Sequence, residues 1–122
     1  MPVSVGIDLG TSNSCIAAVV NGQPIVLADP AGNRTQPSVV AFGYGGAIVV
    51  GPRARQQLAF APENTVYSVK RLIGRRYASP EIERLKINVP WGVVEGPQVT
   101  PACACRVRRS PPRRSARTCC AT

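Results

Sequence analysis

The sequence predicts a mixed α/β fold in which a sheet forms before any helix begins. Three observations predict it. Apolar and polar residues alternate from Pro2 to Leu9 with a period of two, an Asn21-Gly22 pair follows a continuous apolar run, and the first helical stretch opens only at Pro52. The 122 residues, 44% of them hydrophobic, have the length and composition of one ordinary globular domain.

The first three strands are expected to form an antiparallel meander. In the first strand the apolar residues share one face, and Asp8 lies on the other face near the strand's end. The run from Cys15 to Val20 is apolar throughout, as in a strand that is buried on both faces. Asn21-Gly22 suits a type I′ turn, because both central residues of that turn need a positive φ. Residues 23–27 then return as the third strand.

A loop, a second hairpin and a short helix are predicted next. Residues 29–37 are polar and rich in turn formers, so they predict a loop. The stretch "SVVAFGYGGAIVVG" predicts a hairpin with three glycines around its turn. Pro52 suits the first position of a short helix that continues to Phe60.

Two further helices are expected. The first has Thr65 as its N-cap and Gly74 just beyond its end, with Val66, Val69 and Ile73 on one face. At about 100° per residue, Lys70 falls at the rim of that apolar face. Ser79-Pro80 opens the second, through Lys86, and residues 88–94 are expected to be extended, with Trp91 packed into the core or a satellite of it.

The composition changes near Gln98. Of the 15 basic residues, six are arginines in the last 24 residues, which leaves 15 − 6 = 9 for residues 1–98 against all six acidic residues. Four of the five cysteines also lie beyond Gln98. We therefore assign residues 1–98 to one domain and residues 99–122 to a disordered basic tail, since strong like charge and few core-forming residues oppose folding.

The tail admits three interpretations. Its C-x-C and C-C pairs have the wrong spacing for zinc knuckles, and the chain has no His, so a metal site is disfavoured. Its Arg, Ser and Pro residues suit RNA contact. The preferred interpretation is a shifted reading frame: one GC-rich back-translation of "QVTPACACR", read from its third base, encodes the strand-like peptide "GDPRVRVQ".

Targeting signals are not evident. No apolar run approaches the ~20 residues that span a bilayer, and the first residues lack the basic and apolar regions of a secretory signal. We expect a cytoplasmic protein with no membrane partner.

The segment from Asp8 to Asn13, "DLGTSN", is a candidate phosphate-binding hairpin tip. Gly10 permits close backbone approach, and Thr11, Ser12 and Asn13 offer successive backbone N–H groups with hydroxyl and amide side chains. Asp8 would hold a hydrated Mg²⁺ nearby. The same residues also suit an ordinary polar turn, so the spacing alone leaves both interpretations open.

The stretch "VGIDLGTSNSCIAAVVNGQPIVLADPAGNRTQPSVVAF" resembles the opening of the DnaK-type chaperones, the seventy-kilodalton heat-shock family, whose ATPase domain has the actin-like (ribonuclease H-like) fold. "PSVVAF" is also similar in the bacterial rod-shape filament proteins. "NTVYSVKRLIGRRY", Asn64 to Tyr77, resembles the chaperones and not the filament or sugar kinase branches. The resemblance covers about residues 3–97.

The resemblance implies a role for each site residue. Gly10, Thr11, Ser12 and Asn13 would bind the β- and γ-phosphates of ATP, with Ser12 standing where many members have Thr. The remaining roles fall to Asp8, which would hold Mg²⁺ through water, and to Lys70, which would be the catalytic lysine against the γ-phosphate and the attacking water. Phosphoryl transfer needs positioning and charge neutralisation more than acid–base chemistry, so a site without His suits it.

The resemblance also implies the setting. Intact members are ATPases of the stress response that fold polypeptides, and their partners are unfolded chains, a J-domain co-chaperone and a nucleotide exchange factor. Because the family's ATPase domain runs to several hundred residues, we expect an incomplete first lobe that binds ATP weakly and does not turn it over. Cys15 matches a family cysteine that responds to oxidants, although a small buried apolar role is preferred. The alternatives are a non-enzymatic product whose tail contacts nucleic acid, which is not the expected partner, and an actin-like filament protein.

Overall fold

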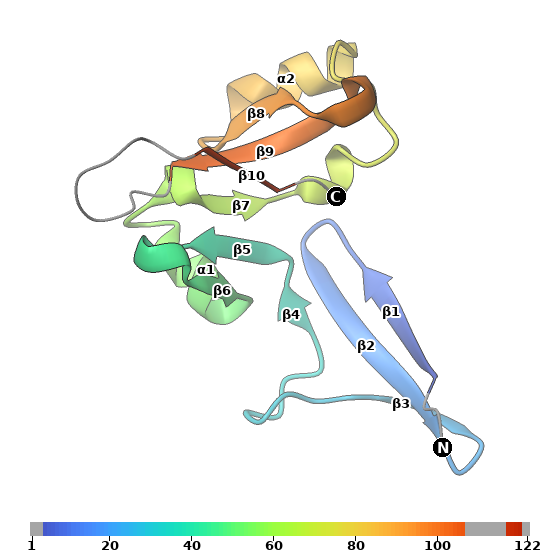
Figure 1. The fold of residues 1–122 in the computed structure, drawn as a ribbon. Helices are drawn as coiled ribbons and strands as arrows, with labels where there is room; N and C mark the ends of the chain where they lie inside the picture. Colours follow the sequence, from blue (N-terminus) through green and yellow to red (C-terminus); the bar gives the residue numbers. More distant parts are fainter. Residues whose placement is uncertain (1–3, 107–116, 121–122) are drawn as a thin grey trace.

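The structure is a computed structural model that describes residues 4–106 and 117–120. The described strands form three small antiparallel sheets, and two α-helices pack near the second and third sheets (Figure 1). This architecture confirms the predicted mixed α/β class. Within the described part of the chain, no helix combines the length and apolar character needed to cross a bilayer.

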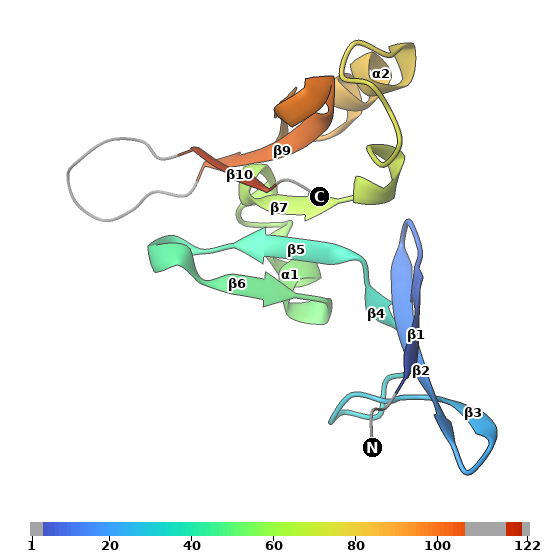
Figure 2. The same cartoon turned by 45° about the vertical axis from the view of Figure 1, so that its right-hand side comes forward.

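The first sheet is the predicted meander. It has the order β1 (Val5–Leu9), β2 (Asn13–Val20) and β3 (Gln23–Val26), and the short strand β4 (Gln36–Pro37) also pairs with β2. Asn21 and Gly22 have φ values of 51° and 76°, as the predicted type I′ turn requires. In both views the sheet projects from the rest of the molecule, which it meets near the β1–β2 tip (Figures 1 and 2).

The expectation that β2 is buried on both faces is wrong. Ala18 is buried, but Val19 is 64% exposed, and the neighbouring β1 is exposed along its whole length. The β-forming residues give the strand its conformation through pairing, and the described residues leave half of its side chains exposed.

The second sheet has the order β6-β5-β7, with β5 (Val39–Phe42) at its centre. β6 (Ile48–Val50) completes the predicted hairpin after a 3-10 turn, η1 (Tyr44–Gly46). The predicted short helix is α1 (Pro52–Gln57), with Pro52 at its start, and its buried Ala54 packs in a small core with Val39 and Ala41.

The third sheet has the order β10-β9-β8, and α2 lies beside it in both views (Figures 1 and 2). Its strands are β8 (Gly92–Glu95), β9 (Pro101–Arg106) and β10 (Arg117–Cys120), and a 3-10 turn, η4 (Pro97–Val99), joins the first two. The predicted second helix is α2 (Pro80–Asn88). It buries Ile82 and Leu85 against Trp91, which is 2% exposed and therefore confirms the predicted core packing.

The helix expected from Thr65 to Ile73 does not form. Thr65–Tyr67 is instead strand β7, which pairs with β5 in the register Val40↔Val66, and a 3-10 turn, η2 (Pro62–Asn64), precedes it. Thr65 is fully buried and donates its hydroxyl hydrogen to the carbonyl of Ala61 at 2.8 Å, so it does not cap a helix. β-branched residues favour strands, and pairing with β5 outweighs the helical spacing of the apolar residues.

The segment from residue 99 onward also differs from its expectation. β9 pairs with β8 in the register Val93↔Cys103, and Ala102 and Cys103 are buried. This pairing gives the segment's few apolar residues a core to join, so residues 101–106 are ordered. Residues 107–116 and 121–122, for which disorder was also predicted, lie outside the described residues. The boundary at Gln98 and the shifted reading frame stay predictions.

Candidate functional site

The β1–β2 hairpin tip is held in shape by its own backbone. The last strand pair is Leu9↔Ser14, so the tip runs from Gly10 to Asn13. A Cβ added at Gly10 would lie 2.1 Å from the carbonyl oxygen of Asn13, a distance that no side chain tolerates. The close turn predicted at Gly10 is therefore present in the structure.

Ser38 braces this tip from a distant part of the chain. Its hydroxyl donates to the carbonyl of Gly10 at 2.8 Å and lies 2.7 Å from the hydroxyl oxygen of Ser14. Its backbone N–H also donates to the carbonyl of Ser12 at 2.8 Å. Ser38 was not among the predicted site residues. It lies in "PSVVAF", between β4, which pairs with β2, and β5.

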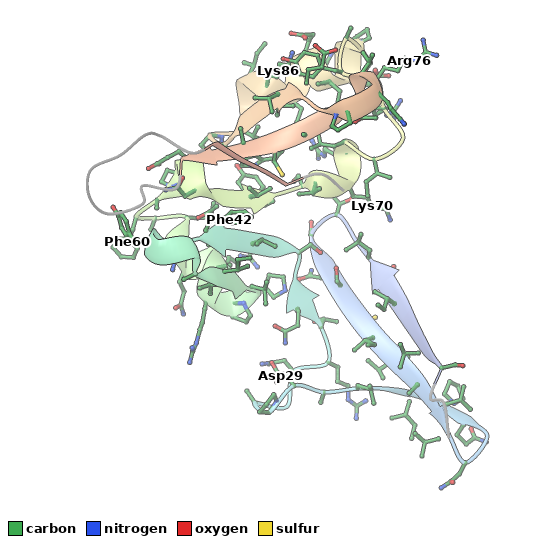
Figure 3. All side chains as sticks on the ribbon, in the orientation of Figure 1. Asp29, Phe42, Phe60, Lys70, Arg76 and Lys86 are labelled. Atoms are coloured by element: carbon green, nitrogen blue, oxygen red, sulfur yellow. The ribbon has the colours of Figure 1, made fainter. Side chains whose placement is uncertain are left out.

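Lys70 lies beside the hairpin tip (Figure 3). Ser68, with a left-handed φ of 59°, ends β7 and turns the chain into the 3-10 helix η3 (Val69–Arg71), which carries Lys70. The predicted position of Lys70 on the rim of an α-helix is thus wrong, because its helix is one short 3-10 turn. The side chain is exposed.

Gly10, Thr11 and Lys70 line one cavity of about 390 Å³. Most of the remaining lining is apolar, with residues from β5, β7 and η3 among it, and Ser14 and Ser38 add hydroxyl groups. The tertiary fold therefore brings together three predicted site residues that lie in two distant parts of the sequence. A fixed cation beside backbone and hydroxyl donors suits an anionic group.

The other three predicted site residues do not line this cavity. Ser12 and Asn13 are exposed at the tip. Asp8 is exposed and pairs with Cys15, on the face of β1 opposite Leu9, which does line the cavity. The described residues contain no group of three or more acidic or cysteine side chains that could hold a metal ion. The predicted role of Asp8 toward Mg²⁺ stays a prediction.

Asp29 organises the loop between β3 and β4. Its carboxylate accepts hydrogen bonds from the backbone N–H groups of Ala31 and Asn33, at 2.9 and 2.8 Å, and from the side-chain amides of Asn33 and Gln36. The side-chain amide of Asn33 above all, and then these other donors, hold the pKa of Asp29 below its usual value.

Cys15 lines a second cavity of about 290 Å³, which lies between this loop and the β1–β3 sheet. Cys15 is half-buried and is a free thiol. Its preferred packing role is thus met only in part, and the response to oxidants that the resemblance implies is untested.

A comparison with protein families identifies the chain. The model described as "Hsp70 protein" matches residues 4–117, which include the hairpin tip and Lys70. Members of this family are ATP-binding chaperones, and the mixed α/β architecture with antiparallel sheets fits the actin-like ATPase fold that the sequence predicts for them. The match spans 117 − 4 + 1 = 114 of the 122 residues. The chain therefore belongs to the Hsp70 family.

Proposed function

We propose that this chain carries the first phosphate-binding loop and the catalytic lysine of a DnaK-type chaperone ATPase. The observation that supports the proposal most directly is the cavity shared by Gly10, Thr11 and Lys70. Two segments that each resemble the ATPase site thus contribute to one concave surface. The DnaK-type subgroup is supported by the segment Asn64–Tyr77, which resembles these chaperones and contains Lys70.

Each residue has a distinct part in the proposed chemistry. The Lys70 ammonium neutralises charge on the γ-phosphate as the bond to the leaving oxygen breaks. The Thr11 hydroxyl and the backbone N–H groups of Thr11, Ser12 and Asn13 hold the phosphate oxygens, with Gly10 shaping the turn. Asp8 would hold Mg²⁺ through water, and the ion would supply positive charge that neutralises the phosphates.

The proposed cellular role follows that of the subgroup. ATP hydrolysis would drive the folding of unfolded polypeptides in the cytoplasm, with a J-domain co-chaperone and a nucleotide exchange factor as partners.

By itself this chain is expected to bind ATP weakly and not to hydrolyse it. Two or three hydrogen bonds, each contributing about 0.5–3 kcal/mol, hardly exceed the ~4–15 kcal/mol cost of association.

The test is an MgATP titration of the full chain, followed by the backbone and lysine NMR signals. We expect shifts that concentrate at Gly10–Asn13 and at the Lys70 ammonium. Lys70→Ala should weaken the response severalfold, whereas Arg53→Ala, an exposed cation on α1, should not. Shifts confined to other residues, or an unchanged response in Lys70→Ala, would refute the proposed site. Phosphate release above that of Lys70→Ala would refute the predicted lack of turnover.

A further inference from the structure

A basic groove lies between η3 and α2, on the far side of Lys70 from the hairpin tip. Its cavity of about 340 Å³ is lined by four cations and one carboxylate, which gives a net charge of 4 − 1 = +3: Lys70, Arg71, Arg75, Arg84 and Glu81. Ile73, Leu85 and Asn88 complete the lining. We call this set of residues the basic groove.

The described lining of the groove holds one carboxylate for its four cations, that of Glu81, which interacts with both Arg75 and Arg84. Arg75 contacts Glu81 at 3.3 Å, but both side chains are half exposed, and such surface pairs contribute little. The other described ion pair joins Lys86 to Glu83, outside the groove. Several guanidinium groups are therefore available to a ligand, and guanidinium binds carboxylates and phosphates with two parallel hydrogen bonds.

The uncharged residues that line the groove favour one class of anionic ligand over another. Ile73, which is 50% exposed, and the buried Leu85 line the groove together with its cations, so the lining combines positive charge with apolar side chains. Among the described residues that line the groove, none is aromatic, and single-stranded nucleic acids are held largely by stacking on aromatic side chains. A ligand that combines carboxylates with an aliphatic side chain matches the groove better than a nucleic acid does.

We infer that the basic groove binds an acidic peptide segment of a partner protein. The carboxylates of the peptide pair with Arg75 and Arg84, and one aliphatic side chain packs on Ile73. This inference goes beyond the proposed ATPase role and assigns no part to Lys70, which lines both cavities. The inference rests on charge complementarity. A groove of net charge +3 that also has apolar lining residues attracts a peptide that has carboxylates and an aliphatic side chain.

The test is the binding of a fluorescent peptide of alternating Glu and Leu residues to the full chain, measured by anisotropy. The double variant Arg75→Glu with Arg84→Glu should bind at least about tenfold more weakly. The matched control is Arg53→Glu with Arg55→Glu, two exposed cations on α1, which makes the same change in net charge and should bind within about twofold of the wild type. All three proteins keep the six arginines beyond Gln98, so nonspecific attraction to these is the same in each.

A charge-reversed peptide and a second pair of substitutions complete the test. A peptide with Lys in place of Glu should bind the Arg75→Glu, Arg84→Glu variant better than the wild type. If that variant fails to fold, as judged by Trp91 fluorescence, Arg75→Gln with Arg84→Gln replaces it. Equal losses in the groove and control variants would overturn the inference, and so would tighter groove-dependent binding of a uridine-rich RNA. MgATP binding should be unchanged in the groove variant, so a failure of the proposed ATPase site is seen separately.

Discussion

At the scale of single residues, Gly6 and Gly10 differ in the space that a side chain would have, although they lie only four residues apart. A Cβ at Gly10 would lie 2.1 Å from the Asn13 carbonyl oxygen, whereas a Cβ at Gly6 meets nothing within 4 Å. Both lie within "VGIDLG", where the sequence predicts a strand position for Gly6 and a close turn at Gly10. The difference arises because Gly10 lies inside the turn and Gly6 lies on an exposed strand.

This contrast predicts the effects of two alanine substitutions. Gly10→Ala should lower the free energy of unfolding by about 1–3 kcal/mol, because the tip must open to admit the methyl group. Gly6→Ala should leave it unchanged or raise it slightly, since Ala loses less conformational freedom than Gly. Urea unfolding followed by Trp91 fluorescence measures both. Equal effects of the two substitutions would contradict the steric argument.

The lowered pKa of Asp29 makes the free energy of unfolding depend on pH. Its hydrogen bonds lower its pKa in the folded state, so its contribution is complete above the unfolded value, near 3.8, and is lost as the pH falls through the lower folded value. The wild type should therefore lose stability on acidification below that value, and Asp29→Asn should lose less over the same range. Glu63→Gln, at an exposed glutamate, is the control. Parallel pH curves for wild type and Asp29→Asn would contradict the assignment.

At the scale of elements, Ser38 joins the first and second sheets. It lies between β4 and β5, and its hydroxyl holds the Gly10 carbonyl and the Ser14 hydroxyl at the tip of the β1–β2 hairpin. The position of the tip relative to Lys70 thus depends on a residue that is itself outside the predicted phosphate loop.

Ser38→Ala should cost about 1–3 kcal/mol of stability, since it removes two partly buried hydrogen bonds. It should also weaken the response of the hairpin tip to MgATP, because only the backbone hydrogen bond from Ser38 to the Ser12 carbonyl then remains between Ser38 and the hairpin. Ser4→Ala, at an exposed serine before β1, should do neither. Unfolding curves and the NMR titration measure the two effects. A stability loss without any change at the tip would mean that Ser38 does not position it.

The elements that the sequence predicts well are those fixed by neighbouring residues. The Asn21-Gly22 turn and the Pro-led starts of α1 and α2 depend on local backbone geometry, and all three are present. The helix at 65–73 fails because β7 is fixed by β5, more than twenty residues earlier, and β9 was missed because its burial depends on β8 and Trp91. The residues of the candidate site could be chosen from the resemblance, but the cavity that joins Gly10 to Lys70 exists only in the tertiary structure.

At the scale of the whole molecule, the first sheet carries a largely exposed apolar face, and the loop at residues 28–36 forms a cavity with part of it. Strand alternation and the register Val5↔Ala18, Ile7↔Ile16 and Ala18↔Ile25 place these residues on one side of β1–β3. The exposed large side chains on this face come from all three strands and the residue after β3: Val5, Ile7, Leu9, Ile16, Val20, Ile25 and Leu27. Within the described residues β1 pairs only with β2, so its outer edge is also open.

A contiguous apolar face of this kind, beside an open strand edge, predicts that the chain associates with further copies of itself. Ile7, which is 69% exposed at the centre of β1, lies in the middle of that face, so Ile7→Lys should place a charge in the contact and shift the chain toward monomer. Phe60→Lys is the matched control, because Phe60 is 87% exposed but lies outside the sheet. Sedimentation velocity over a range of concentrations should show larger species for the wild type and Phe60→Lys than for Ile7→Lys. A wild type that stays monomeric at every concentration, or an equal decrease in both variants, would show that this face does not drive association.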